Sequence, residues 1–395
     1  MNERGKRVSW VELYLDLVFV LAVGRLAHLI VAEPEMHSVW VALGLFFVLW
    51  WTWIGFAVLY NRHGDDDRTE HLLFLLGSVP IGVAAVAIEP AAQGDPAVFA
   101  GALAVARLIL AVAHGDGGPD LLRGRIARAY LVSVALFAAS ILVAEPWVYV
   151  LWFVAVSQES SVLLRSDHAA GRGHRARRPV PEHPREALDP HHFAERFGLF
   201  LIILLGEVLV EAGQAPAEST ATWIAIGAAM VLAAALWWLY FDSSAEINLR
   251  VLELSGGSPT MARTIFAVGH MIPSFALIGI AAGVGLLLEQ EDARFGYVLV
   301  STGIGLYMLG TRAFLRARRG PFALRLLVVI ATFNLGRLHE VLSPDEYVVF
   351  VAAWVVVCAG LATQLDADGH VGPAEEVGAG EAAVAGADAP DRVGG

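Results

Sequence analysis

The sequence is almost without cysteine and lysine: Cys358 and Lys6 are the only ones in 395 residues. A single cysteine excludes an intrachain disulfide and a cysteine-rich metal centre. Charge is also scarce, because Asp, Glu, Lys and Arg make up 17% of the chain, whereas soluble domains average about 25%. With 57% hydrophobic residues and a mean hydropathy of +0.61, the composition predicts a polytopic membrane protein.

The motifs of familiar enzyme and nucleic-acid sites are also missing. The chain has no glycine-rich phosphate loop ending in Lys-Ser/Thr, no G-x-S-x-G, no H-E-x-x-H and no basic surface interleaved with aromatic residues. The connections between apolar stretches are mostly short, and the longest contains no recognisable nucleophile beside a base. We therefore expect no enzymatic activity, no cofactor, no metal and no nucleic-acid partner. A membrane enzyme that acts on lipids is the least supported alternative.

Long apolar stretches dominate what is present, and they predict an all-α fold. A membrane helix needs about 17–25 predominantly apolar residues, and the chain has twelve such stretches. They cover residues 10–31, 39–60, 71–88, 97–113, 126–143, 147–164, 192–212, 222–241, 263–288, 295–315, 321–339 and 346–364. The basic residues before the first stretch resemble the start of a signal peptide, but no small-residue cleavage site follows. We expect the first stretch to remain as a span.

Arginine is concentrated in alternate loops, which predicts the orientation of the spans. One set of loops carries Arg4/Lys6/Arg7, Arg62/Arg68, Arg123/Arg125, the 165–185 cluster, Arg250 and Arg316/Arg318/Arg319. The other set carries Glu33/Glu35, Glu89/Asp95, Glu145, Glu218 and Glu289/Glu291/Asp292, with Arg294 and Arg337 as exceptions. The pattern predicts a multi-pass protein of the bacterial inner membrane with both termini in the cytoplasm.

The two halves of the chain resemble each other. Glu12 in the first span aligns with Glu195 in the seventh, and the aromatic run 50–53 in the second aligns with 237–240 in the eighth. Because six helices is an even number, the halves share one orientation and form a parallel 6+6 repeat. The predicted parts are an N-terminal half (1–164), a cytoplasmic Arg/Pro-rich linker (165–191), a C-terminal half (192–365) and a disordered acidic Gly/Ala tail (366–395).

The first span contains charges where lipid-facing side chains are expected. Glu12 and Asp16 lie one helical turn apart, and Arg25 and His28 follow in the same span. A charge at the centre of a membrane helix costs about 2.5–3.5 kcal/mol on insertion scales, so it usually has an interior partner or lines a polar pathway. The two carboxylates suit proton transfer, cation binding or pairing with arginine. For Glu12, which is near the interface, simple solvation is an equal alternative.

Arg107 lies near the middle of the fourth span without an acidic neighbour in sequence. A guanidinium at that depth needs a partner from another helix, and the candidates are Asp16, Glu159 and Glu207. A role in substrate binding or gating and a purely structural ion pair are both consistent with the sequence.

The seventh span carries two further groups of charges. His192 and Glu195 are spaced i,i+3, but one such pair supplies too few ligands for a metal. A pH-responsive cytoplasmic gate fits better, because histidine titrates nearest neutrality. Glu207 and Glu211 lie toward the external half, where we expect them to line an outer vestibule together with Arg25 and His28.

Three motifs resemble the bacterial low-temperature-requirement A family. They are E-L-Y-L-D-L-V-F-V (residues 12–20), H-F-A-E-R-F-G-L-F-L-I-I-L-L-G-E (192–207) and W-W-L-Y-F-D (237–242). The resemblance covers nearly all the spans and implies a polytopic inner-membrane protein linked by name to growth in the cold, without a reaction. Its matching positions are Glu12, Asp16, His192, Glu195, Arg196, Gly206, Glu207 and Asp242. Leu15 stands where the family often has an aromatic residue.

The leading hypothesis is a secondary transporter or an ion or proton pathway. Its candidate substrate- or ion-binding residues are Glu12, Asp16, Arg25, Arg107, His192, Glu195, Arg196, Glu207 and Glu211. We expect Asp16, Arg107 and Glu207 to meet around one wet cavity between the halves. The expected partners are the lipid bilayer and a small solute or ion, protons included; a homo-oligomer is left open. The alternative is a non-transporting sensor or scaffold in cold adaptation whose ion pairs only fix the packing.

Overall fold

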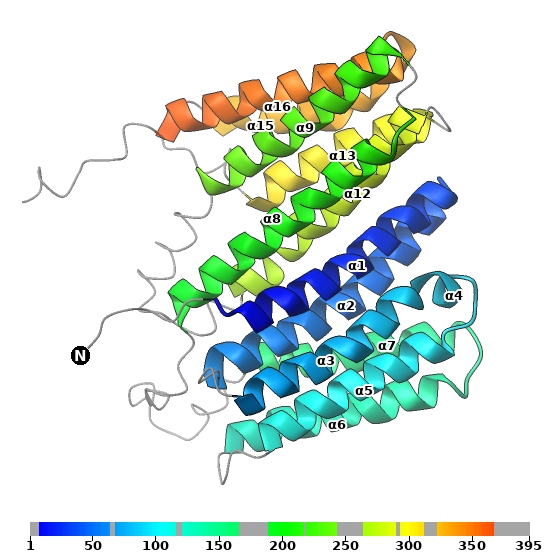
Figure 1. Ribbon diagram of the computed structural model, residues 1–395, viewed down its shortest axis with the longest axis vertical. Coiled ribbons are helices and arrows are strands. Elements are labelled where there is room, and N and C mark those ends of the chain that lie inside the picture. The colour runs from blue at the N-terminus through cyan, green and yellow to red at the C-terminus, as the bar shows by residue number, and fades with distance from the viewer. Residues whose placement is uncertain are drawn as a thin grey trace, which may run out of the picture.

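The computed structural model describes residues 8–63, 68–115, 121–165, 189–216, 219–242, 264–289, 293–311 and 322–366. Within these ranges the secondary structure is helical, with turns and no strand, as the all-α prediction requires. The predicted linker and tail lie almost entirely outside the described residues. The helices form an elongated stack of roughly aligned rods (Figure 1).

The N-terminal half contains six long helices and one short one. They are α1 (Trp10–Ala32), α2 (Met36–His63), α3 (Arg68–Val86), α4 (Ile88–Ala92), α5 (Ala97–Gly115), α6 (Leu121–Ser140) and α7 (Trp147–Arg165). The C-terminal half contains α8 (Pro190–Gln214), α9 (Thr220–Phe241), the π-helical turn η2 (Thr264–Val268), α12 (Met271–Glu289), α13 (Ala293–Thr311), α15 (Phe322–Asn334), the 3₁₀ segment η3 (Leu335–Glu340) and α16 (Pro344–Asp366).

A helix lies over each of the twelve predicted ranges, but the helices differ in length and polarity. In the described part of the chain, six are long and apolar enough to cross a membrane. These six are Trp10–Ala32, Met36–Asn61, Ala97–Gly115, Thr220–Phe241, Thr264–Glu289 and Pro344–Gln364. Others are short or charged: α15 has only 13 residues, and α8 contains four charged side chains between Glu195 and Glu211. Twelve crossings therefore remain a prediction.

The first helices of the two halves lie at the interface between them. α1 packs against α2 and α3 within its own half, and against α8 and α12 of the other half. α8 packs in turn against α9 and α12. Figure 1 shows α1 and α8 running side by side, with their N-terminal ends at the same end of the stack. The charged residues of both helices are thereby brought to one interface.

Local capping starts both of these helices. Ser9 and Glu12 form a capping box on α1, in which the Ser9 hydroxyl accepts from the Glu12 N–H and the Glu12 carboxylate accepts from the Ser9 N–H. Asp189 caps α8 by accepting from the backbone N–H groups of His191 and His192, with Pro190 at the first helical position. Glu12 and His192 therefore occupy fixed positions in the first turns of their helices.

The outer surface of the stack carries many exposed large apolar side chains. Leu76, Val79 and Phe153 are examples, with 62–63% of each side chain exposed. An apolar surface this extensive is typical of a protein that contacts lipid. Cys358 is buried, as expected for a small core residue.

Candidate functional site

Four charged or titratable side chains from α1 and α8 form a buried network across the two halves. Nη1 of Arg196 donates to Oε1 of Glu12 at 2.6 Å, and Nη2 donates to Oδ1 of Asp16 at 3.0 Å. Nε2 of His192 lies 3.1 Å from Oε2 of Glu12. All four side chains are fully buried. One guanidinium thus bridges two carboxylates, and the solvated alternative for Glu12 is wrong because the packing of α8 covers it.

The orientation of His192 is fixed by Asn61 of α2. Oδ1 of Asn61 accepts from the Asp189 N–H at 2.9 Å, so its Nδ2 is turned toward Nδ1 of His192, also at 2.9 Å. Because Nδ2 is a donor, Nδ1 of His192 must be the acceptor. The proton of the neutral imidazole is therefore on Nε2, from which it is donated to Glu12. This tautomer follows from the hydrogen-bond network.

Trp53 of α2 completes the surroundings of Asp16. Its indole Nε1 donates to Oδ1 of Asp16 at 2.7 Å, and Arg196 lies over the indole ring, 5.3 Å from the centroid. Oδ2 of Asp16 and Nε of Arg196 are buried without a hydrogen-bond partner. Removing one member of a buried ion pair costs about 3–5 kcal/mol, because it leaves the other charge uncompensated. The network therefore ties α1, α2 and α8 together although it leaves two polar atoms unsatisfied.

Arg107 belongs to a separate buried cluster inside the N-terminal half. Its Nε and Nη2 donate to the carboxylate of Glu159 on α7 at 3.1 and 2.8 Å, and Nη1 donates to the Thr52 hydroxyl at 3.0 Å. The guanidinium also lies over the Phe137 ring, 4.2 Å from the centroid. Of the three predicted partners only Glu159 is correct. The expectation that Arg107 meets Asp16 and Glu207 is wrong, because Glu159 of α7 and Thr52 of α2 bind its guanidinium within the N-terminal half.

Glu207 and Glu211 lie in the same interface but toward the other end of α8. Arg196 and Glu207 are 11 residues apart, or about 16 Å along the helix. Glu207 is 8% exposed and faces Gly24 of α1, while Glu211 faces Gly285 of α12. A Cβ atom on either glycine would lie 2.9 Å from the nearest carboxylate oxygen. The two glycines therefore provide the space that these carboxylates occupy.

The remaining predicted site residues do not join either cluster. Arg25 and His28 lie on the exposed side of α1, so the outer vestibule that we expected them to line with Glu207 and Glu211 does not form around them. Glu195 is exposed on α8, although its neighbours in the motif are buried. Among the described residues no group of three or more His, Cys, Asp or Glu side chains is arranged to hold a metal.

Buried aromatic side chains separate the network from Glu207. The Phe200 ring of α8 packs against Phe19 of α1 at 5.5 Å and against Trp53 at 4.3 Å between centroids. Phe197 packs edge-on against Trp53 at 5.0 Å. These four rings are at most 1% exposed. We call this group the aromatic septum; it places a dry layer between the two sets of carboxylates.

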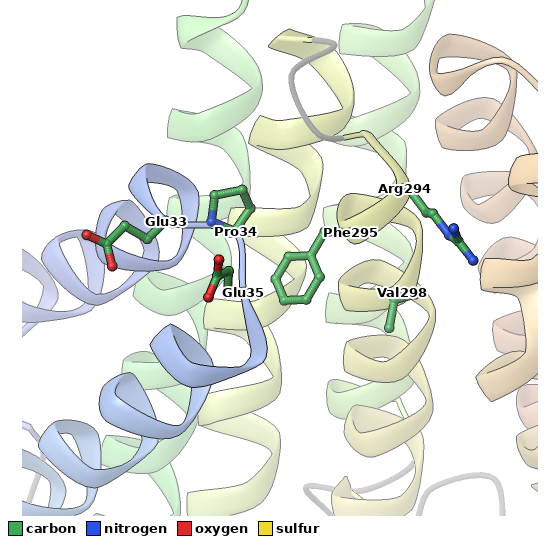
Figure 2. A pocket seen from close by; sticks show the side chains of 6 residues that line it. All are labelled: Glu33, Pro34, Glu35, Arg294, Phe295 and Val298. Atoms are coloured by element: carbon green, nitrogen blue, oxygen red, sulfur yellow. The ribbon is translucent and has the colours of Figure 1, made fainter.

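A cleft of about 540 Å³ opens at the far end of the interface. Its lining comes from the α1–α2 turn on one side and the start of α13 on the other, and comprises Glu33, Pro34, Glu35, Arg294, Phe295 and Val298. Figure 2 shows Glu35 and Phe295 on facing walls, whereas Arg294 points away from the two glutamates. The cleft is thus bounded by both halves of the chain.

Sequence reasoning missed the polar residues of α2. Thr52 and Trp53 are consecutive, and through them α2 contacts both buried clusters, while Asn61 orients His192. Their sequence signal was a threonine, an asparagine and tryptophans within an otherwise apolar span. A buried tyrosine–histidine pair was also missed: the Tyr240 hydroxyl lies 2.7 Å from Nε2 of His270, next to η2.

Comparison with known proteins gives a family but no reaction. The model of the bacterial low temperature requirement A protein (LtrA) family matches residues 7–366. An uncharacterised protein of Rhizobium meliloti (strain 1021) is 28% identical over 364 residues, which cover 88% of this chain and 81% of that protein. No solved structure matches the chain. The resemblance predicted from the three sequence motifs is confirmed.

Proposed function

The chain belongs to the bacterial low temperature requirement A family, and we propose that it is a secondary transporter that carries protons along the interface between its two halves. The observation that carries the proposal is the position of Glu207. This carboxylate is 8% exposed, faces a glycine, and has no cationic partner in the described part of the chain. A buried carboxylate without a counter-charge is costly unless it takes up a proton or a cation.

The network at the other end of the interface supplies groups that can exchange a proton. Glu12, Asp16, His192 and Arg196 are connected by hydrogen bonds, and His192 donates from Nε2 to Glu12. Glu207 lies about 20° from Arg196 in projection around α8, so both face the same neighbours. One side of α8 therefore carries titratable groups at both ends of the interface.

The packing of the helices supports the predicted 6+6 repeat and twelve crossings. In the N-terminal half α1 packs on α2 and α3, α3 on α5, and α5 on α6. In the C-terminal half the corresponding pairs are α8 with α9 and α12, α12 with α13, and α13 with α15. Equivalent neighbours in the same order are what a duplicated unit produces. Transporters with internal repeats place their sites where the repeats meet, as α1 and α8 do.

The aromatic septum favours a carrier over an open channel. A permanently open pathway needs continuous polar or hydrated lining, whereas Phe19, Trp53 and Phe200 are packed together between Asp16 and Glu207. A carrier instead exposes a site to one side at a time by moving one repeat against the other. Following the arginine pattern of the loops, we further propose that the Ser9 end of α1 faces the cytoplasm of the bacterial inner membrane.

The proposal is tested by proton flux into vesicles. Purified protein is reconstituted into liposomes that contain a trapped pH-sensitive dye, and a potassium diffusion potential is imposed with valinomycin. We expect wild-type protein to acidify the vesicles faster than protein-free liposomes do, and Asp16→Asn to return the rate to the protein-free level. Glu195→Gln, an exposed position on α8, is the matched control and keeps the wild-type rate. Wild-type protein that moves no protons, or Asp16→Asn at the full rate, overturns the proposal.

One observation favours the alternative of a non-transporting sensor or scaffold. Arg107 and Glu159 form a bidentate pair that is sealed within one half and touches neither set of interface carboxylates. Such a pair holds α5 and α7 together through their side chains without offering a pathway. If the buried carboxylates of the interface only fix the packing in the same way, folded Asp16→Asn protein keeps every cellular function. We expect that variant to lose proton flux.

A further inference from the structure

We infer that the α1–α8 network is a closed gate, and that the cleft at the opposite end of the interface is the open entrance of the same pathway. The gate network comprises Glu12, Asp16, His192 and Arg196, with Asn61 and Trp53 as its supports. The inference rests on the proposed transport between the halves. It adds a conformational assignment: the structure is open toward the α1–α2 turn and closed toward the Ser9 end.

The hydrogen bonds and ion pairs that join the two halves are concentrated at the closed end. Arg196 binds both carboxylates of α1, and Asn61 of α2 holds both the backbone of Asp189 and the ring of His192. A further tie runs from the indole of Trp50 on α2 to the carbonyl of Ala267 in η2 at 2.8 Å. Hydrogen bonds and ion pairs thus hold α1 and α2 to three parts of the C-terminal half near the Ser9 end of α1. These parts are the start of α8, its capping residue and η2.

At the opposite end of the interface, near the α1–α2 turn, the two halves are separated by a cleft. There the α1–α2 turn and the start of α13 face each other across the cleft of about 540 Å³, and side chains of both halves line it (Figure 2). Glu211 interacts electrostatically with Glu289 at the end of α12 and with Glu207 deeper in the interface. All three of these carboxylates belong to the C-terminal half. At this end no ion pair joins described residues of the two halves, whereas opposite charges hold the halves together at the closed end.

The aromatic septum lies between these two ends and can act as the pivot. Flat rings in contact tolerate a small tilt while they keep water out, and no ion pair has to break within the septum. Glu207 is on the cleft side of Phe200, so a proton from the open end reaches it, after the less buried Glu211, without passing the septum. Opening the other end requires Arg196 to leave its carboxylates. The unpartnered Oδ2 of Asp16 and Nε of Arg196 would gain water when that happens.

The gate is tested by measuring distances at both ends of the full chain. The only cysteine is buried, so Cys358→Ala gives a background for paired spin labels. One pair, at Trp10 and Glu195, spans the closed end, and the other, at Met36 and Val298, spans the cleft; all four positions are exposed. In Arg196→Gln we expect the first distance to lengthen and the second to shorten, each by on the order of 5 Å. The matched control is Arg25→Gln, which removes an exposed arginine of α1 and leaves both distances unchanged.

If Arg196→Gln does not fold, Glu12→Gln supplies the same test, because it keeps the shape of the side chain and removes one charge of the gate. Opposite changes at the two ends support the gate. Unchanged distances in a folded gate variant, or lengthening at both ends, overturn it. These outcomes are separate from the flux measurement. If the two distances change in opposite directions but the protein moves no protons, the gate stands and proton transport is refuted. If the protein moves protons and the distances do not change, only the gate is refuted.

Discussion

Glu207 of α8 lies directly against Gly24 of α1. A Cβ atom at residue 24 would be 2.9 Å from Oε1 of the carboxylate and 3.4 Å from Oε2. Phe19 and Phe200 separate this contact from the ion network, and the cleft lies beyond it. The space for the Glu207 carboxylate is therefore provided by the absence of a side chain on the facing helix, which makes residue 24 a sensitive probe of the pathway.

Replacing Gly24 by alanine should impair transport more than stability. The added methyl group meets the far end of a flexible side chain, so we expect the protein to fold and its unfolding temperature to change little. The carboxylate must however move away from its position between α1 and α8, so the proton flux should fall severalfold. Glu207→Asp, which shortens the side chain, should restore part of the flux in the Gly24→Ala background.

Gly44 provides the control for that substitution. It lies on α2 with no atom within 4 Å of a Cβ atom placed on it, so Gly44→Ala should leave the flux at the wild-type value and raise stability by at most about 1 kcal/mol, because alanine favours a helix more than glycine does. Equal flux in Gly24→Ala and Gly44→Ala would contradict a role for the Glu207 carboxylate at its observed position.

Trp53→Phe should weaken the network without changing any charge. The substitution removes the indole N–H that donates to Oδ1 of Asp16 at 2.7 Å, while the ring contacts are largely kept. Loss of a buried donor to a charged acceptor costs about 1–3 kcal/mol. Chemical denaturation in detergent should register a loss of this size, and Trp223→Phe, at a position 63% exposed, should register none. Equal stability of the two variants would show that the hydrogen bond contributes nothing.

Arg107→Leu should lower the stability of the protein far more than removal of both members of the Arg107–Glu159 pair does. The single substitution leaves the Glu159 carboxylate buried and uncompensated, at a cost of about 3–5 kcal/mol. The double variant Arg107→Leu/Glu159→Leu removes both charges and should recover most of that stability. Because this pair is outside the proposed pathway, the double variant should also retain proton flux. A double variant that is stable but inactive would place Arg107 within the transport machinery.

The protonated nitrogen of His192 is a direct prediction of the Asn61 contact. Because Asn61 donates to Nδ1, neutral His192 should carry its proton on Nε2. Nitrogen NMR of protein with labelled histidine, compared with the His192→Gln variant to assign the signal, should show the Nε2–H form. In Asn61→Ala that preference should weaken. A dominant Nδ1–H form in the wild type would mean that the Asn61 side chain is oriented the other way.

The helices could be predicted from the sequence because apolar run length and local caps determine them. Each predicted range contains a helix, and the capping box of Ser9 and Glu12 is readable as a sequence pattern. The ends differ where polar residues extend a helix: α8 starts at Pro190 because Asp189 caps it, two residues before the apolar stretch begins. The number of crossings does not follow from the number of helices, because four charged side chains lower the apolarity of α8.

The partners of the buried charges could not be predicted in the same way, because they depend on which helices pack together. Arg196 is 180 residues from Asp16, and nothing local pairs them. One error was avoidable. Nine residues separate Asp16 from Arg25, which at about 100° per residue places them on opposite sides of α1. Because Asp16 is buried, Arg25 falls on the exposed face of α1 and does not line the vestibule that we expected around it.

The most direct test of transport between the halves is the proton flux of Glu207→Gln beside that of Glu195→Gln in vesicles of the same composition. Both variants lose one carboxylate from α8, one buried against Gly24 and the other exposed. We expect protein-free leakage for Glu207→Gln and the wild-type rate for Glu195→Gln. Folded Glu207→Gln protein that acidifies the vesicles as fast as the control would contradict it.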